Sequence, residues 1–331
     1  MIARRQLLLG AASLAVAGTA PAAARPPRIF MILFRGETGV EKGFRNYFQT
    51  HRIDVELIMR DVALDVGKVP ALLREARSMQ ADMIYTWGTP VTLAVAGRHD
   101  RVDPALHVTD IPVIFTMVAS PEGAGLIASR RGSGRNLTGT SHVVPMDQQL
   151  SAMRAYRAFK RLGMLYNPAE PNSMQNLREM RSAASRDGFT LVERAVPLDA
   201  KGQPIADALP GLIDAIAREN LQLLYMGPDS FLSANRKAYT EAALAARLPT
   251  FSATEMALRD GKALFGLVSG YENVGRLTAY KAAQILQHKM APGMIPIETL
   301  ARFSYLVNMS VAKALEFYPP LKVINYAELL R

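Results

Sequence analysis

Residues 28–34 read RIFMILF, a short run of large apolar and β-branched residues followed by a segment with helical periodicity. Such a run predicts a buried strand, and a strand followed by a helix is the repeating unit of a parallel sheet. Further runs of this kind begin near residues 53, 82 and 111, and a second set begins near residues 161, 190, 221 and 248. Within each set the starts are 25 to 31 residues apart, the length of a strand, a crossover helix and two short loops. The fold class predicted is therefore α/β, with two doubly wound parallel-sheet lobes.

The segment between the two sets, residues 116–145, contains Gly123, Gly125, Gly132, Gly134 and Gly139. This glycine density predicts loops and a hinge rather than a core element. The lobes are expected to divide there.

After the second set come a strand-like run at 263–269, a helix at 272–288, an extended run at 302–309 and a short helix at 311–317. If these elements return first to one lobe and then to the other, the chain crosses between the lobes three times, and such crossings act as a hinge. The predicted N-terminal lobe is 28–142 plus 266–299, and the predicted C-terminal lobe is 143–265 plus 300–331.

Length and composition agree with two folded lobes. The chain has 331 residues, 49% hydrophobic and 21% charged, with no low-complexity tract. That length exceeds the usual size of one hydrophobic core. We expect a globular protein almost throughout.

Residues 1–24 have the anatomy of a signal peptide, with Arg4 and Arg5 before a short apolar stretch and small residues at 22–24. Cleavage after Ala24 is predicted, and the paired arginines resemble a twin-arginine export signal. The alternative, a retained membrane anchor, is disfavoured because the apolar stretch is short. The chain has no cysteine, which removes disulfides, thiolate metal sites and a lipid-attachment cysteine. A soluble periplasmic protein is expected.

Charge does not indicate a nucleic-acid partner. Without residues 1–24 the 39 basic residues fall by Arg4 and Arg5 to 37 against 29 acidic ones, a net charge of +8. Arg130-Arg131 and the other basic pairs form no stripe interleaved with aromatic residues. The excess is interpreted as solvated faces, and nucleic-acid binding is not expected.

The sequence carries no recognisable catalytic or cofactor motif. It lacks a G-x-S-x-G elbow, a P-loop, an H-E-x-x-H pair and a dinucleotide fingerprint after the first strand. The five histidines lie in separate segments without the i, i+4 spacing of a helical metal site. We therefore expect no enzymatic activity, no metal and no cofactor.

Polar and helix-initiating residues follow the predicted strands, where open parallel sheets bind their ligands. The candidate ligand-binding residues at these strand ends are Arg35, Trp87, Gly88, Thr89, Thr116, Asn167, Asp229 and Ser252. Thr89-Pro90 starts a helix whose free amides can hold an anion, and Ser252 with Glu255 has the spacing of a capping box. Each residue also has a purely structural interpretation, because caps satisfy helix ends in every α/β protein.

Several segments resemble a bacterial family of ABC transporter substrate-binding proteins that includes tryptophan- and tyrosine-associated members. The resemblance runs from about Arg28 to Leu315. Its motifs are IPVIFT at 111–116, PEGAGLI at 121–127, NLTGTS at 136–141, LGMLYNP at 162–168 with Asn172-Ser173, and Gly275-Arg276 after Tyr271. It implies a type I periplasmic-binding fold that captures a small solute between two lobes and delivers it to a membrane permease.

By this resemblance the ligand-facing loops fall at Arg35, 87–89, Thr116, Asn167 and Asp229, and at Ser269 to Tyr271. The chain departs from its relatives at two loop positions, which hold Ser120 and Gly270 where acidic residues are common. The absence of these carboxylates predicts an anionic or neutral ligand and puts an α-amino acid in doubt. Arg35 is expected to pair with a carboxylate of the ligand, and Trp87 to cover a flat apolar portion of the ligand. An aromatic ring and an aliphatic face both fit this second expectation.

The predicted function is therefore a monomeric periplasmic solute-binding protein that serves an ABC permease in the inner membrane. The alternative is a periplasmic sensor that presents its bound form to a histidine kinase or chemoreceptor. Gene neighbourhood separates the two, because permease and ATPase genes favour transport whereas a kinase gene favours signalling.

Overall fold

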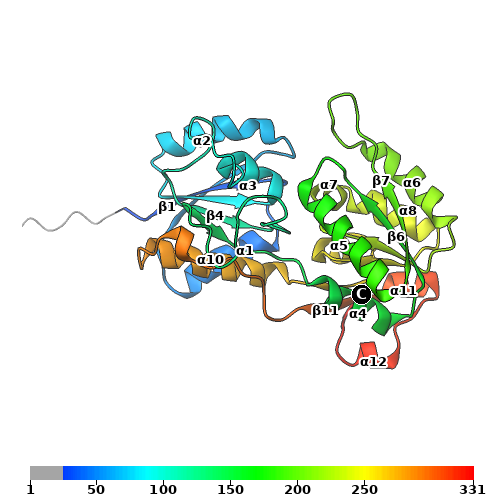
Figure 1. Ribbon diagram of the computed structural model, residues 1–331. Coiled ribbons are helices and arrows are strands. Elements are labelled where there is room, and N and C mark those ends of the chain that lie inside the picture. The colour runs from blue at the N-terminus through cyan, green and yellow to red at the C-terminus, as the bar shows by residue number, and fades with distance from the viewer. Residues whose placement is uncertain (1–24) are drawn as a thin grey trace, which may run out of the picture.

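The computed structural model describes residues 25–331, in which the chain forms two α/β lobes (Figure 1). The signal peptide predicted at 1–24 lies outside the described residues. One lobe holds a five-stranded sheet in the order β2-β1-β3-β4-β5, and the other holds a seven-stranded sheet in the order β12-β11-β10-β9-β8-β6-β7. The predicted fold class, two mostly parallel sheets with covering helices, is confirmed. One pair departs from it, because β10 and β11 are antiparallel.

The first lobe is built from the N-terminal third of the chain and one returning helix. Its elements are β1 (Arg28–Leu33), α1 (Gly39–Thr50), β2 (Glu56–Asp61), α2 (Val69–Ser78), β3 (Met83–Trp87), α3 (Thr89–Ala96), β4 (Val113–Thr116), β5 (Leu137–Gly139) and α10 (Tyr271–Leu286). The strands β1, β3 and β4 are buried at nearly every position, as expected for a sheet covered on both faces. Helices α1 and α10 pack together below the sheet in Figure 1, and α2 and α3 lie above it.

The second lobe has two hydrophobic clusters, one on each face of its seven-stranded sheet. Its elements are α4 (Met146–Tyr156), β6 (Arg161–Tyr166), α5 (Pro171–Asp187), β7 (Thr190–Ala195), α6 (Leu209–Ala217), β8 (Leu223–Met226), α7 (Ser230–Ala234), α8 (Arg236–Ala245), β9 (Thr250–Ser252), α9 (Glu255–Arg259), β10 (Phe265–Val268), β11 (Ser304–Asn308), α11 (Met309–Leu315), α12 (Leu321–Ile324) and β12 (Glu328–Leu330). One cluster packs α4, α5 and α11 against the sheet, and the other packs α6, α8 and α9.

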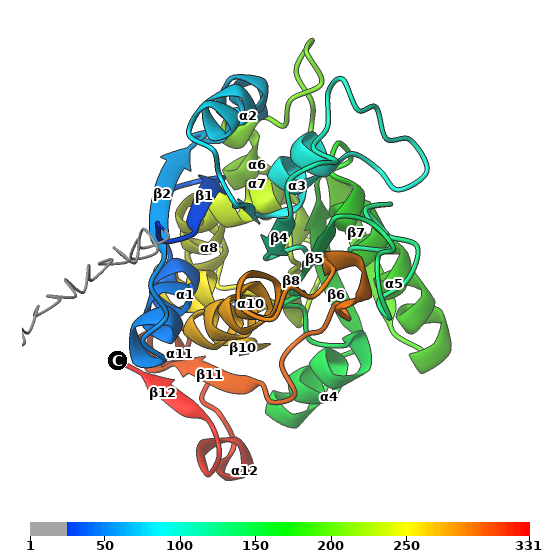
Figure 2. The ribbon, with the colours of Figure 1, turned by 90° about the vertical axis from the view of Figure 1, so that its left-hand side faces the viewer.

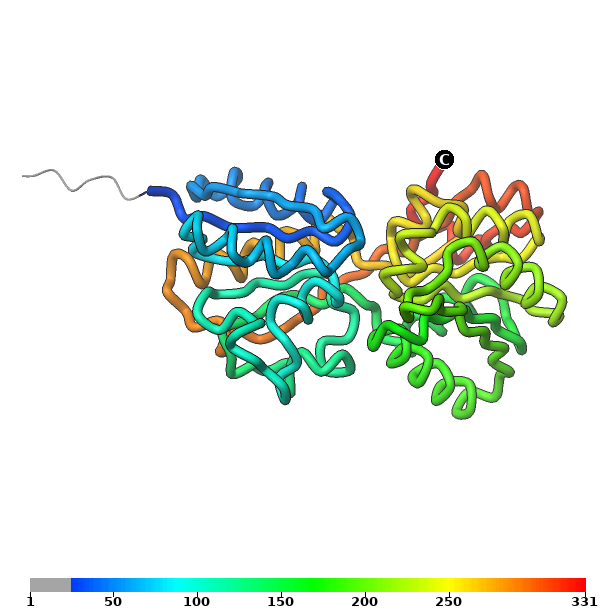
Figure 3. The backbone as a smooth tube through the Cα atoms, turned by 90° about the horizontal axis from the view of Figure 1, so that it is seen from above, coloured from blue at the N-terminus to red at the C-terminus, as the bar shows by residue number. Residues whose placement is uncertain are grey.

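Three connections join the lobes, at residues 140–145, 269–270 and 299–303. Figure 3 shows the lobes side by side with a narrow waist between them. The boundary predicted at residue 266 is wrong, because β10 pairs with β9 and β11 in the second sheet and the crossing follows Val268. The glycine-rich segment predicted as loops also contains a strand, since β5 pairs with β4.

Two glycines let the returning helix α10 sit directly on α1, and Figure 2 shows the two helices side by side. A Cβ on Gly275 would lie 1.9 Å from the carbonyl oxygen of Val40, and a Cβ on Gly43 would lie 2.0 Å from that of Glu272. Only glycine permits this approach. The close packing fixes Tyr271, the first residue of α10, against the first lobe.

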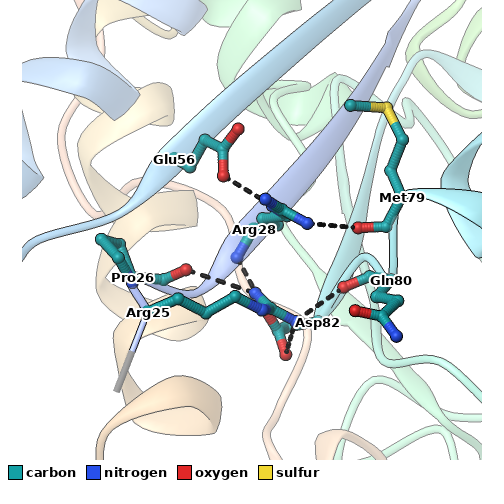
Figure 4. Close-up of polar contacts among 7 residues, drawn as sticks. All are labelled: Arg25, Pro26, Arg28, Glu56, Met79, Gln80 and Asp82. Atoms are coloured by element: carbon teal, nitrogen blue, oxygen red, sulfur yellow. Dashed lines mark hydrogen bonds and ion pairs between the residues drawn. The ribbon is translucent and has the colours of Figure 1, made fainter. Parts of the chain in front are cut away.

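A polar cluster, drawn in Figure 4, holds the start of β1, which lies on the side of the first lobe away from the second lobe (Figure 1). The Arg28 guanidinium donates to Glu56 on β2 and to the carbonyl oxygen of Met79. Asp82 accepts from the backbone N–H of Arg28 at 2.7 Å and pairs with Arg25. Arg25, the first residue predicted after cleavage, is thereby bonded to the folded lobe.

Within residues 25–331, no helix combines the length and the apolar character that crossing a membrane would require.

Candidate functional site

The carboxyl ends of the strands in both lobes face a cavity between them, with an empty volume of about 290 Å³ that opens to solvent. Ligand sites of α/β sheets occur at this edge. The lining residues are Arg35, Trp87, Thr89, Met117, Ala119, His142, Asn172, Pro228, Asp229, Ser230, Ser233, Thr254 and Tyr271. Both lobes contribute, so a ligand held here would contact both.

Arg35 extends from the end of β1 across the cavity. Its guanidinium carbon lies 4.7 Å from the centroid of the Trp87 ring, a cation–π contact, and Nη1 donates to the carbonyl oxygen of Ser230 at 3.4 Å. Burial lowers the pKa of Arg35 from its ordinary value, yet arginine stays charged throughout the physiological range. The first lobe therefore places a desolvated positive charge in the cavity.

Trp87 serves as the platform under this guanidinium, with its side chain 4% exposed. The indole face expected to cover a flat part of the ligand is thus occupied by Arg35. The indole Nε1–H has no hydrogen-bond partner among residues 25–331. Trp87 consequently holds an unpartnered N–H donor beside the cavity that its side chain lines, and it orients Arg35.

His142 and Tyr271 complete the first lobe's side of the cavity. His142 is 5% exposed, and burial, with the nearby Arg35 charge, lowers its pKa to about 3. The imidazole is therefore neutral near pH 7. Burial raises the pKa of Tyr271 to about 12, so its phenol keeps its proton. Neither His142 Nδ1 nor the Tyr271 hydroxyl finds a partner in the described part of the chain.

The second lobe holds two buried carboxyls near this array, Asp229 and Glu170, of which Asp229 lines the cavity. Asp229 caps α7 by accepting from the Leu232 N–H at 2.8 Å through Oδ1, while Oδ2 is buried without a partner in the described chain. Glu170 accepts from the backbone N–H of Ser230 at 2.9 Å and from its hydroxyl at 2.7 Å. Burial, and then the charge of Asp229, raises the pKa of Glu170 to about 8. Burial raises the pKa of Asp229 from its ordinary value as well.

Among the unpartnered polar atoms of the lining residues, His142 Nδ1 and the Tyr271 hydroxyl can accept or donate, and the other four divide by lobe. Arg35 Nε–H and Trp87 Nε1–H, from the first lobe, can only donate. Asp229 Oδ2, when ionised, and Asn172 Oδ1, from the second lobe, can only accept. Buried polar atoms without partners are rare in folded proteins. This set is therefore complementary to a ligand with an acidic end toward the first lobe and a basic end toward the second.

The absence of acidic residues at Ser120 and Gly270 does not leave the cavity without a carboxyl. Asp229, also predicted as a site residue, lines the cavity, and Glu170 is hydrogen-bonded to Ser230, which lines it too. Both lobes line the cleft, so the absence of an acidic residue from one lobe leaves the carboxyls of the other lobe in place.

The structure brings five of the eleven predicted site residues to the cavity, namely Arg35, Trp87, Thr89, Asp229 and Tyr271. Two others lie in neighbouring cavities: Ser120 caps the turn at Gly123 beside the hinge, and Asn167 lies at the outer mouth of the cleft. The remaining four, Gly88, Thr116, Ser252 and Ser269, do not line it. Gly88 caps α3 with φ at +82°, a backbone conformation that favours glycine.

The hydroxyls of Thr116 and Ser252 form hydrogen bonds within their own lobes. Thr116 bonds to Thr140 at 3.2 Å inside the first lobe, and Ser252 accepts from the Thr254 N–H at 3.1 Å. The predicted capping box is therefore absent, and Thr254 rather than Ser252 is the N-cap residue of α9. Glu255 instead accepts from the Tyr271 N–H at 2.6 Å, which links the second lobe to the start of α10.

Sequence reasoning missed eight lining residues, including His142, Asn172, Ser230 and Thr254. His142 lies in a crossing rather than after a strand. Asn172 lies in the first turn of α5, and Ser230 and Thr254 lie one and two residues past the position inspected. The motif Asn172-Ser173 was the available signal, because it matched the family pattern without being assigned a role.

No group of three or more His, Asp or Glu side chains within residues 25–331 has a metal-binding arrangement. The donors described above suit hydrogen bonding and charge pairing with an organic ligand instead.

The stability of the ligand-free protein should fall as the pH rises from 6.5 to 8. Glu170 has a folded pKa of about 8 against 4.5 ordinarily, so the folded state keeps a proton that the unfolded state releases. His142 has the opposite effect, because its pKa of about 3 against 6.5 costs stability as the pH falls below 6.5. The contributions of these two groups to stability oppose each other between pH 4.5 and pH 6.5. Of the two, only Glu170 changes stability above pH 6.5. Denaturant titrations of wild type and Glu170→Gln check this, with the variant expected to lose most of the decline; an equal decline in both contradicts it.

Two lobes joined by three crossings, with a polar cavity between the carboxyl ends of their strands, define a ligand receptor of the type I periplasmic-binding class. Residues 38–329 match the family described as ABC transporter substrate binding protein, and the chain belongs to that family. The predicted family is thereby confirmed, and so is the prediction that the protein is not an enzyme.

Similar proteins agree with this assignment. A tyrosine-binding protein of Clostridioides difficile is 25% identical over 265 residues, which cover 80% of this chain and 71% of the relative. Two solved structures share the fold: a conserved domain protein from Vibrio cholerae (TM-score 0.80, 20% identity), and an ABC domain from Streptococcus pneumoniae in complex with L-Trp (TM-score 0.78, 19% identity). Each comparison covers 93% of this chain and 100% of the other.

Proposed function

We propose that the protein captures a small zwitterionic ligand of the α-amino-acid type in the periplasm and delivers it to an ABC permease. The observation that carries the proposal is the division of unpartnered atoms, with donors and Arg35 on one lobe and acceptors with the Glu170–Asp229 pair on the other. A ligand carboxylate would pair with Arg35, and its ammonium group with Asp229. Family membership supports delivery to a permease, and the ligands named for the relatives are amino acids.

A zwitterion also couples ligand capture to lobe closure. Each of its charges is bound by a different lobe, so both pairings form only when the lobes approach each other. A ligand that binds the closed form better shifts the population toward it by that difference in affinity. We infer that the lobes rotate about the crossings at 140–145, 269–270 and 299–303.

The experiment is a charge series on one carbon skeleton, measured by calorimetry on the mature protein. The amino acids are screened first, and the best one is compared with its decarboxylated amine and its deaminated acid. We expect each analogue to bind at least about tenfold more weakly than the zwitterion, because each leaves one buried charge unpaired. If the deaminated acid binds as tightly as the zwitterion, the ligand is an anion and the role given to Asp229 is wrong. Stimulation of the partner permease ATPase by the loaded protein tests delivery.

A further inference from the structure

A second cavity adjoins the ligand cavity on the hinge side, and we call it the hinge groove. It shares Ala119, Asn172 and Pro228 with the ligand cavity, and it has an empty volume of about 720 Å³ that includes open solvent. Residues 143–145 of the first crossing and Met146, the first residue of α4, line one side, and α5 lines the other. A ligand anchored at Arg35 and Asp229 could therefore extend an arm past Asn172 into this groove.

Asn172 stands at the passage between the two cavities, with its side chain 3% exposed. Its Nδ2 donates to the carbonyl oxygen of Pro228 at 2.7 Å. A carbonyl can only accept, so this bond fixes which end of the amide is nitrogen. The oxygen Oδ1 is left buried without a donor in the described chain.

Asn176, one helical turn further along α5 and 5% exposed, is oriented by a relay of hydrogen bonds. Gln149 Nε2 donates to the Val144 carbonyl at 2.7 Å, so Gln149 Oε1 accepts from the Tyr225 hydroxyl at 3.0 Å. The Tyr225 oxygen then accepts from Asn176 Nδ2 at 3.2 Å. Because every step has one possible direction, Asn176 Oδ1 must be an acceptor, and it has no donor among residues 25–331.

Two further features concern the surroundings of Asn176 and of the groove. A Cβ at Gly227 would lie 2.4 Å from Asn176 Oδ1, so only glycine permits the close approach of this oxygen to the backbone there. Thr299, in the third crossing, lines the groove with a hydroxyl that is also buried and unpartnered in the described chain. The unpartnered atoms of the groove are thus amide oxygens and a hydroxyl, which suit a neutral N–H or O–H donor.

We propose that the hinge groove is a specificity subsite, in which Asn176 and Thr299 bind a neutral hydrogen-bond donor carried by the ligand's side chain. The subsite rests on the proposed function, because the acid and amine of the ligand must be anchored first. The ligand class is an amino acid whose side chain ends in a hydroxyl or an amide. A buried acceptor left without its donor is costly, so the groove selects against the same ligand lacking that group.

The test uses matched ligand pairs that differ in the side-chain donor: tyrosine against phenylalanine, and glutamine against 2-aminohexanoic acid. Calorimetry on the wild-type protein should give an affinity at least about tenfold higher for the donor-bearing member of one pair. Thr299→Val and Asn176→Leu should each reduce that ratio without weakening binding of the apolar member. Ser269→Ala is the control, because its hydroxyl is also buried and unpartnered in residues 25–331 but does not line the groove.

The outcomes separate the two proposals. Ratios near one for both pairs in the wild-type protein overturn the subsite, and so does a ratio that survives both groove substitutions. Because the wild-type comparison needs no substitution, it remains decisive even if Asn176→Leu fails to fold. If no amino acid binds, the proposed function itself fails.

Discussion

Arg35→Ala should weaken binding of the cognate amino acid by about tenfold to a hundredfold while the protein remains folded. The guanidinium lies within the cavity over the Trp87 ring, where burial removes most of the water that would otherwise screen it. A charge-assisted bond to a carboxylate in such a place is stronger than the same bond at a surface. Calorimetry at fixed pH and salt measures the loss, and a thermal melt confirms folding.

Two further variants define what Arg35 contributes. Arg60→Ala is the matched control, because Arg60 also lies over an aromatic ring, 5.8 Å from the centroid of Phe30, but outside the cavity. We expect it to leave affinity unchanged. Arg35→Lys keeps the charge and loses the planar fork, so an intermediate affinity is expected. If Arg35→Ala binds the ligand as tightly as Arg60→Ala does, the carboxylate is held elsewhere.

The strands of both lobes could be predicted because a parallel sheet covered on both faces requires unbroken apolar runs. The run at 28–34 becomes β1, and the run beginning at 161 becomes β6. The short strand β5 was not predicted, because its three residues, Leu137–Gly139, lie in a glycine-rich segment and pair only with β4. The boundary at 266 was misplaced for a related reason: sequence shows that a strand is present but not which sheet it joins.

The site was predictable only where topology alone places a residue. Arg35, Trp87 and Asp229 follow strands directly and reach the cavity. Thr116 also follows a strand, yet its hydroxyl bonds to Thr140 within the lobe, and nothing in the local sequence distinguishes the two cases. The Glu170 carboxyl accepts a hydrogen bond from Ser230, which lies sixty residues further along the chain. The packing of two loops brings these residues together, and local sequence does not reveal it.

Asp229→Asn should weaken binding of a zwitterionic ligand by about a hundredfold, with little effect on folding. Asparagine is as good a helix cap as aspartate, so its oxygen can still accept from the Leu232 N–H. The substitution removes the negative charge that pairs with the ammonium group of the ligand. It also removes one of two buried carboxyls, so thermal stability near pH 7 should be unchanged or higher. Calorimetry with the amino acid and with its deaminated acid checks the assignment, because only the amino acid should lose affinity.

The double variant Glu170→Gln/Asp229→Asn then separates the two carboxyls. Asp229 is the second cause of the raised pKa of Glu170, so removing it lets Glu170 ionise more readily and take over part of the pairing with the ammonium group. The single Asp229 variant should therefore retain a residual preference for the zwitterion that grows as the pH rises through 7. The double variant should lose that preference at every pH. Equal affinities of the single and double variants for the amino acid across this range would show that Glu170 does not contribute to binding the cation.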